Sequence, residues 1–427
     1  MATGRFSTLT STGHEVVQVG GLSNAITVTW PISGQHTITV TALNNLDRAT
    51  TTHSFIARQP QNVLGGVQDA KDLVTWQNLT WSTTLPTGTP YVVKVRVGNS
   101  ATPDEHWSDW VVLAEQVRAL NDSASLASLP PARYLQWQVD GAATVNLAAN
   151  VQMGTPTYTP FAYTRPQRYI TSNTTWTRSN SPYLIDGNVL VNVGARLTIE
   201  PGVTVKFAGP YLLLVEGTLV ARGTAEQPIT FTSWHVRGQP GDWAYIVFED
   251  SAGDASFDGS FNYLGGSALQ HVIVEYAGVA VSAVAAASKQ DSTGIQPFYD
   301  TNNLGYAVDA INTVLYADHV TVRHSRAGGL RSIGGVLTYN TVISNTLMNP
   351  SRNFNGFGIA NSSAITNSGG GGLIANNLVA GNQISVTDNS NNYYLTLRGF
   401  GIYGSNNIEI VGNRVENNWI AGISTVH

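Results

Sequence analysis

The sequence predicts an all-β protein in which antiparallel strands come first and a parallel β-helix follows. The 427 residues include 42 Gly and 17 Pro, yet 42% of the chain is hydrophobic. This composition is typical of short strands joined by turns and not of a disordered chain. Apolar and polar residues alternate with period two before residue 160, and a polar–β-branched–polar spacing recurs after residue 270.

Charge and composition exclude several classes of function. The chain carries 22 basic and 27 acidic residues, so only 11% is charged, and the net charge is −5. No Lys/Arg cluster is dense enough to neutralise a run of phosphates, which excludes a nucleic-acid binder and a basic membrane-surface protein. No apolar run approaches about 18 residues, so we expect no membrane span. Cysteine is absent, which excludes disulfides, thiolate zinc sites and a cysteine nucleophile.

The first predicted domain covers residues 1–60. Residues 24–57 alternate as two or three strands, too few to close a sandwich comfortably. They begin almost at Met1 and no signal peptide precedes them, so we expect the natural protein to start earlier. The segment from Gly34 to Val40 (GQHTITV) resembles the last strands of a polycystic-kidney-disease-like or other immunoglobulin-like module. The resemblance implies a partial immunoglobulin-like β-domain.

The second predicted domain, residues 61–160, is an antiparallel β-sandwich. Trp76, Leu79 and Trp81 precede a turn at 86–88, and Val and basic residues alternate at 93–97. The segments TPDEHWSDW (102–110) and RYLQWQV (133–139) resemble β-sandwich modules that occur beside catalytic or repeat domains in large secreted bacterial proteins. That resemblance implies a spacer or a sugar-binding module.

The third predicted domain, residues 165–427, is a parallel β-helix. A polar residue, a β-branched residue two positions later and a polar residue three further on recur in five places. The repeats start 48, 22, 37 and 36 residues apart, and 22 residues is the length of one coil. Stacked coils bury columns of Val, and Asn side chains at the turns bond to the next coil. The five repeats are Gln270/Val272/Glu275, Asp318/Val320/Arg323, Asn340/Val342/Asn345, Asn377/Val379/Asn382 and Asn413/Val415/Asn418.

The start of this region is the most specific match to a known family. LTIEPGVTVKF (197–207), LLLVEGTLVARGTAEQPITFTS (212–233) and LQHVIVEYAG (269–278) closely resemble right-handed parallel β-helix repeat proteins of secreted bacterial type. The resemblance implies right-handed coils and an extracellular or cell-surface location. It implies a polysaccharide or a cell-surface protein as partner, without fixing an activity, because the fold group includes lyases, hydrolases, tailspikes and adhesins. Since the repeats run to the end of the sequence, we also expect end-to-end self-association.

A lyase site would need basic residues on an exposed sheet face, to abstract a proton and bind a uronate carboxylate. The candidates are Arg323, His324 and Arg326, near Asp309 and Asp318. Strand parity turns Val320 and Val322 inward and Arg323 outward, with His324 at the bend. The alternative interpretation is a solvated outer face with no ligand.

Other candidate sites are an acidic loop and two tryptophans. Asp250, Asp254 and Asp258 could bind Ca²⁺ through carboxylate oxygens, although a polar turn explains the same residues. Trp107 and Trp110 could stack on sugars, although core roles are common for Trp. No other cofactor is expected. A glycoside hydrolase is disfavoured because its adjacent Asp pair is absent.

Two functions from different classes therefore stay open. The first is a secreted or cell-surface structural and binding protein that contacts carbohydrate. The alternative is a polysaccharide lyase acting on an acidic glycan, and a glycoside hydrolase ranks third.

Overall fold

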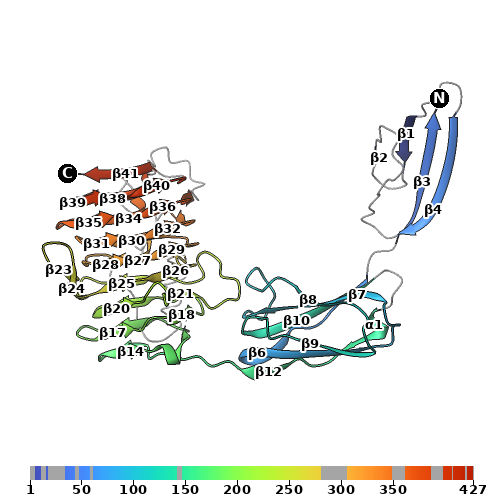
Figure 1. Ribbon diagram of the computed structural model, residues 1–427, viewed down its shortest axis with the longest axis horizontal. Helices are drawn as coiled ribbons and strands as arrows, with labels where there is room; N and C mark the ends of the chain where they lie inside the picture. Colours follow the sequence, from blue (N-terminus) through green and yellow to red (C-terminus); the bar gives the residue numbers. More distant parts are fainter. Residues whose placement is uncertain are drawn as a thin grey trace, which may run out of the picture. The chain divides into compact units, whose positions relative to one another are not determined.

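The computed structural model describes most of the chain, and its residues form two compact units (Figure 1). Among the described residues, no helix is long and apolar enough to cross a membrane. The first unit consists of Met1–Val97 and Asp109–Thr159, and the second of Gly98–Ser108 and Pro160–His427. The residues described are 5–10, 16–17, 34–43, 48–57, 61–141, 147–279, 305–348, 361–385, 398–405, 407–418 and 421–426.

The first unit holds two antiparallel sheets. The first sheet has the order β2-β1-β3-β4, and β3 and β4 pair along their whole lengths. This agrees with the strands predicted within 34–57, whereas 24–33 lies outside the described residues, and the immunoglobulin-like resemblance stays a prediction. The strands are β1 (Arg5–Thr10), β2 (Val16–Val17), β3 (Gly34–Leu43) and β4 (Arg48–Ala57).

The second sheet forms around a core of alternating apolar residues. Trp76, Leu79 and Trp81 are buried, and the Trp81 indole donates a hydrogen bond of 2.8 Å to the Tyr91 hydroxyl. The elements are β5 (Gln61–Leu64), β6 (Gln68–Thr83), β7 (Pro90–Gly98), β8 (Val111–Gln116), β9 (Asn121–Ser125), β10 (Ala132–Gly141), α1 (Leu147–Asn150), β11 (Val151–Met153) and β12 (Thr157–Pro160).

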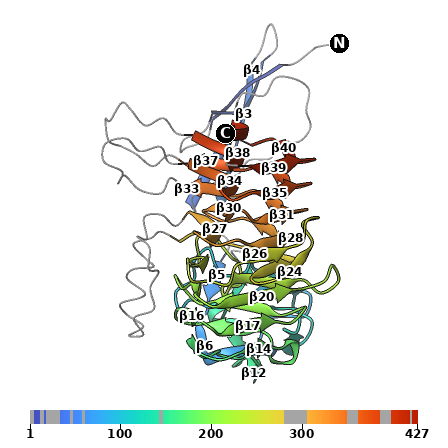
Figure 2. The ribbon, with the colours of Figure 1, turned by 90° about the vertical axis from the view of Figure 1, so that its left-hand side faces the viewer.

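The second unit is a parallel β-helix, which confirms the predicted fold class. Successive coils stack in three parallel sheets, seen from two sides in Figures 1 and 2. Sheet 1 contains β13 (Tyr169–Ile170), β16 (Val189–Val191), β19 (Leu213–Val215), β22 (Ile246–Phe248), β27 (Tyr306–Ala310), β30 (Gly328–Ser332), β34 (Asn361–Ser368), β38 (Arg398–Ser405) and β41 (Ala421–Val426).

The other two sheets follow the same order of coils. Sheet 2 contains β14 (Thr174–Trp176), β17 (Arg196–Ile199), β20 (Thr218–Arg222), β25 (Ala268–Gln270), β28 (Tyr316–Asp318), β31 (Val336–Thr338), β35 (Gly372–Ala375) and β39 (Ile408–Val411). Sheet 3 contains β15 (Tyr183–Ile185), β18 (Thr204–Phe207), β21 (Ile229–Ser233), β26 (Val272–Glu275), β29 (Thr321–Arg323), β32 (Thr341–Ile343), β36 (Leu378–Ala380) and β40 (Arg414–Glu416).

One 3₁₀ turn and two short pairs of strands complete the unit. The 3₁₀ turn η1 covers Arg178–Asn180 in the first coil. The strands β23 (Ser256–Phe257) and β24 (Tyr263–Gly265) form an antiparallel pair, and β33 (Thr346–Met348) pairs in parallel with β37 (Gln383–Ser385).

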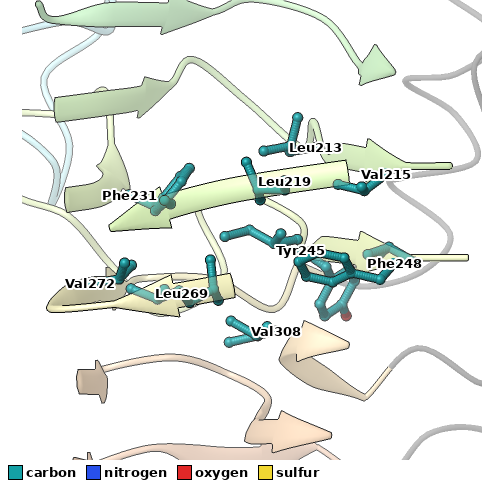
Figure 3. Close-up of a cluster of buried hydrophobic side chains, with 14 of the residues drawn as sticks. Leu213, Val215, Leu219, Phe231, Tyr245, Phe248, Leu269, Val272 and Val308 are labelled. Carbon is teal, nitrogen blue, oxygen red and sulfur yellow. The ribbon is translucent and has the colours of Figure 1, made fainter. Parts of the chain in front are cut away.

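The core lies inside the coils, where one side chain from each sheet meets the others. Figure 3 shows Leu213 of sheet 1, Leu219 of sheet 2 and Phe231 of sheet 3 in this interior. All three are fully buried, and burying each contributes roughly 1.5–3 kcal/mol relative to exposure. The rings of Phe207 and Trp243 stack in parallel, with centroids 4.0 Å apart.

In the last five coils, from β26 to β40, two corners flank the strand of sheet 3, and each is formed by a residue with positive φ. The corner before the strand is formed by His271, His319, Tyr339, Asn376 and Gly412, whose φ angles lie between 48° and 66°. The corner after the strand is formed by Tyr276, His324, Ser344, Gly381 and Asn417. Gly and Asn adopt this left-handed conformation at little cost, but the bulkier residues are strained there.

Asparagine ladders run through the last coils, as the sequence predicts. The backbone N–H of Asn340 donates to Oδ1 of Asn377, whose own N–H donates to Oδ1 of Asn413, at 2.7 and 2.9 Å. A second ladder joins Asn345, Asn382 and Asn418 in the same way. These side chains are almost fully buried up to the last coil, so the ladders satisfy polar groups that water cannot reach.

One predicted alignment is wrong by two residues. The repeats place Val320 over Val342, but Val322 pairs with Val342, so this coil is 20 residues long and not 22. The N–H of Val320 instead donates to Oδ1 of Asn340, and Val320 is the apolar start of that ladder. Because Val320 and Val322 both point inward, either could satisfy the spacing in the sequence.

The first ladder should contribute strongly to stability. Replacing Asn377 with Ala removes the acceptor of the Asn340 N–H and one donor to the Leu337 carbonyl, both in the interior. We expect the free energy of unfolding to fall by about 2–5 kcal/mol, measured by denaturant titration. The exposed neighbour Asn376, changed to Gly, is the control and should change it by less than about 1 kcal/mol. Equal effects for both variants would contradict the ladder's role.

Candidate functional site

Arg323 lies on the outer face of sheet 3 and is committed to an ion pair. Its Nε and Nη2 both lie 2.8 Å from Oε2 of Glu275, which occupies the same position one coil earlier. The other Glu275 oxygen accepts a hydrogen bond of 2.9 Å from the Thr232 hydroxyl. Burial lowers the pKa of nearby Lys206, and the charge of Glu275 partly offsets this. The Arg323 cation is therefore neutralised within the protein.

His324 and Arg326 are both exposed, and each contacts a different part of the protein. His324 is exposed at the corner after β29, and its ring stacks on Tyr276, with centroids 6.0 Å apart. Arg326 is also exposed, and its Cδ lies where a side chain on Gly241 would be. Of the three predicted residues, two are accessible to a ligand and Arg323 is bound to Glu275.

Asp309, which the sequence places near this group, forms an ion pair with Arg331 on sheet 1. Asp309 is fully buried and accepts a hydrogen bond from Nε of Arg331, while the Arg331 guanidinium lies over the Tyr306 ring at 5.1 Å. Burial raises the pKa of Asp309, although Arg331 opposes this effect. The pair is thus separate from Arg323, which belongs to sheet 3.

A column of stacked rings lies at the corner between sheets 2 and 3. The rings of His271 and His319 have centroids 4.6 Å apart, and those of His319 and Tyr339 are 5.1 Å apart with planes tilted by 15°. Tyr339 is the most accessible of the three at 53% exposure, and Asn376 follows it at the same corner. One face of the Tyr339 ring is therefore not covered by another ring.

A polar network supports this column. Oδ2 of Asp318 lies 3.0 Å from Nδ1 of His319 and accepts a hydrogen bond from Gln270, and Oδ1 accepts one from the Thr338 hydroxyl. Gln270 in turn accepts a hydrogen bond from Arg222. Burial raises the pKa of Asp318, but the hydrogen bonds from His319, Thr338 and Gln270 together lower it below its usual value. The network fixes the position of the His319 ring.

We name Asp318, His319, Tyr339, Glu275 and Arg323 the corner surface. It combines ring edges, a half-exposed tyrosine ring and paired charges on adjoining sheets. Such a surface can bind a ligand that has both apolar C–H faces and hydroxyl groups. The sequence patterns did not identify His271, His319 and Tyr339, although each directly precedes a residue of the inward column, at positions 272, 320 and 340.

The two predicted sugar-stacking tryptophans are covered by protein groups. Trp107 is 1% exposed, its indole packs against Gly98, and its Nε1 donates to the Ser100 hydroxyl at 2.9 Å. Trp110 is half-buried, and the Arg96 guanidinium lies 4.5 Å from its ring centroid. Stacking on a sugar would require the Trp107 ring to become exposed.

Two of the three predicted calcium ligands accept hydrogen bonds from the backbone of the protein. Asp258 accepts hydrogen bonds from Asn262 and Ser260, and Asp254 accepts one from the Val314 N–H, while Asp250 is exposed. Asp258 and Asp254 thus stabilise turns. Within the described ranges, the group of three ligand-type side chains whose donor atoms lie within 4.8 Å of one another is His106, His235 and Asp242.

Asp318 should make the fold sensitive to acid. Because its pKa is lowered in the folded state, its contribution is complete above the unfolded pKa of about 3.9 and is lost as the pH falls below that value. We expect Asp318→Asn to lower stability at pH 7 by about 1–2 kcal/mol and to flatten the pH profile between pH 5 and 3. Thermal melts across this range measure both effects, and a mutant profile parallel to the wild type would contradict the role of Asp318.

Comparisons with known proteins agree with the architecture. Residues 168–288 match the family model described as a pectate-lyase like beta helix domain. A 56-residue segment is 50% identical to Protein bark beetle of Drosophila melanogaster, which is 13% of this chain and 2% of the length of that protein.

Two solved structures were also compared. The catalytic unit of a GH87 α-1,3-glucanase from Streptomyces thermodiastaticus strain HF3-3 is 10% identical, with a TM-score of 0.17, over 100% of this chain and 95% of its own. The catalytic domain of a GH87 α-1,3-glucanase in complex with tetrasaccharides is 9% identical, with a TM-score of 0.19, over 88% and 92%. TM-scores this low add nothing to the description of the fold. Over residues 168–288, the parallel β-helix of this chain is therefore similar to the pectate-lyase-like β-helix domain.

Proposed function

We propose that the β-helix binds polysaccharide at the corner surface, as a binding protein and not primarily as an enzyme. The observation that carries this proposal is the position of the rings. His271, His319 and Tyr339 all adopt a left-handed backbone conformation, where Asn and Gly serve in later coils. A bulky residue at such a position is strained by roughly 1–3 kcal/mol.

Strain of this kind persists where the side chain has a use. Stacking between the rings offsets part of the strain, but Tyr339, the last ring, stacks on a single ring and stays half-exposed. An accessible tyrosine ring is a group on which the C–H face of a pyranose packs. His319 is exposed beside the Tyr339 ring and could bond a hydroxyl group of the same sugar. The similarity of residues 168–288 to a pectate-lyase-like domain supports a polysaccharide as the ligand.

The lyase alternative has weaker support. A lyase needs a free base and a cation for the uronate carboxylate, and Arg323 is neutralised by Glu275. His324 and Arg326 are the exposed groups that could act in its place. We propose an extracellular or cell-surface location, in keeping with the resemblance to secreted β-helix proteins, and a cell-surface protein is the alternative partner.

The role of the Tyr339 ring in binding is tested by changing Tyr339 to Asn, which fits the left-handed backbone. We expect binding to a retained polysaccharide to weaken several-fold to about tenfold, because an aromatic contact contributes roughly 0.5–1.5 kcal/mol. Affinity electrophoresis over a polysaccharide panel measures this, with an unchanged melt as evidence of folding. Tyr169→Ala, which removes an exposed tyrosine from the first coil, is the matched control. The proposal fails if no polysaccharide retards the wild type, or if both variants bind equally well.

Catalysis is tested separately with acidic polysaccharides, by the ultraviolet absorbance of unsaturated uronate products, with calcium and with chelator. A binding protein gives no increase for the wild type. An increase that is lost in Arg323→Ala without a change in the melt would instead make the protein a lyase with Arg323 in its site. An increase that survives in Arg323→Ala would move the search to His324 and Arg326.

A further inference from the structure

We infer that His106, His235 and Asp242 form a binding site for one divalent transition-metal ion, with Zn²⁺ as the expected occupant. All three belong to the second unit. His106 lies in the segment Gly98–Ser108, and His235 and Asp242 follow β21. No function of the corner surface depends on this site, so the inference goes beyond the proposed polysaccharide binding.

The distances suit a small metal ion. Nε2 of His106 lies 3.0 Å from Oδ1 of Asp242, the rings of His106 and His235 have centroids 4.2 Å apart, and the three ligand atoms lie within 4.8 Å of one another. Bonds of about 2.0–2.1 Å in a tetrahedral site place ligand atoms roughly 3.3 Å apart. A metal ion would replace the hydrogen bond between His106 and Asp242 after a small inward movement of the His235 ring.

The groups behind the ligands hold them in position. Oδ2 of Asp242 accepts hydrogen bonds from the Ser233 hydroxyl at 2.6 Å and from the Gln239 N–H at 2.8 Å, which leaves Oδ1 directed at His106. Oδ1 of Asp104 lies 3.3 Å from Nδ1 of His106. A carboxylate behind a metal-bound histidine is the usual arrangement in zinc sites, because it fixes the tautomer and the ring orientation.

An unpaired ring nitrogen is the second line of evidence. Nδ1 of His235 is buried and has no hydrogen-bond partner, whereas Nδ1 of His106 faces the Asp104 carboxylate at 3.3 Å. A buried nitrogen without a partner is costly, and metal coordination is one way in which a histidine offsets that cost.

Backbone contacts hold the two segments together before any ion enters. The Arg237 N–H donates to the His106 carbonyl at 3.0 Å, and the Asn99 amide donates to the Trp234 carbonyl at 2.6 Å. The ligands are therefore preorganised. Two imidazoles and one carboxylate favour Zn²⁺, Co²⁺ or Ni²⁺ over Ca²⁺ and Mg²⁺, which prefer oxygen ligands. Water would take the fourth position.

The test uses the full chain without a polyhistidine tag, stripped with chelator and then titrated with Zn²⁺, Co²⁺ or Ca²⁺. We expect about one Zn²⁺ per chain by calorimetry and elemental analysis, a visible Co²⁺ spectrum of tetrahedral type, and no tight Ca²⁺ binding. The unfolding temperature should rise in Zn²⁺ and fall back when chelator is added.

Variants locate the ion. His235→Ala and His106→Gln should each weaken Zn²⁺ binding at least tenfold, and His271→Asn, a histidine of the ring column, should leave it unchanged. Circular dichroism establishes that each variant is folded, and the use of two ligand variants keeps the test decisive if one fails to fold. Sub-stoichiometric metal on the folded wild type, or equal affinity in the ligand variants, would overturn the inference. Neither result bears on polysaccharide binding.

Discussion

The register between coils is the constraint on which the rest of the β-helix depends. Each strand pairs with the strand one coil earlier and one coil later, so every position belongs to a column. In sheet 3 the inward column reads Val274, Val322, Val342 and Val379, and all four are fully buried. A side chain in this interior must fit its neighbours above and below as well as those across the coil.

This register tolerates coils of very different length because the additions fall outside one short segment. From β26 onward, the two left-handed corners that flank sheet 3 are five positions apart, from His271 and Tyr276 to Gly412 and Asn417. Equivalent positions nevertheless lie 48, 20, 37 and 36 residues apart along the chain. The corner–strand–corner segment is thus the constant unit of these five coils, and loops are added elsewhere in the coil.

That constant segment explains how far the sequence alone could lead. The fixed spacing within this segment made the valine columns and asparagine ladders predictable, because the residues of each repeat all lie within one segment. The register at Val320 was not predictable, since Val320 and Val322 both point inward and each satisfies the spacing. The alignment could be resolved only by the Asn340 side chain, which bonds to the Val320 N–H.

The candidate site was less predictable because its contacts join distant coils. The sequence predicts Arg323 on an outward face, where it could bind a ligand. In the structure it forms an ion pair with Glu275, 48 residues earlier. Trp107 looked exposed beside acidic residues, yet Gly98 and Ser100 cover it. The metal ligands His106 and Asp242 lie 136 residues apart, so no spacing rule could have joined them.

The described coils also use the first corner in two different ways. In the earlier coils, Val272 and Val320 fill the inward position, and His271 and His319 occupy the corner outside it. In later coils, Asn377 and Asn413 stand at the inward position beside Asn376 and Gly412.

The change from valine to asparagine occurs at Tyr339 and Asn340. In this coil the corner residue is still an aromatic ring, but the inward residue is already an asparagine. Later coils therefore gain order from buried hydrogen bonds and carry unstrained corners. Earlier coils bury valine at the same place, and this apolar burial offsets the strain of a ring at the corner. The column of corner rings thus ends at Tyr339, in the same coil in which the asparagine ladder begins with Asn340.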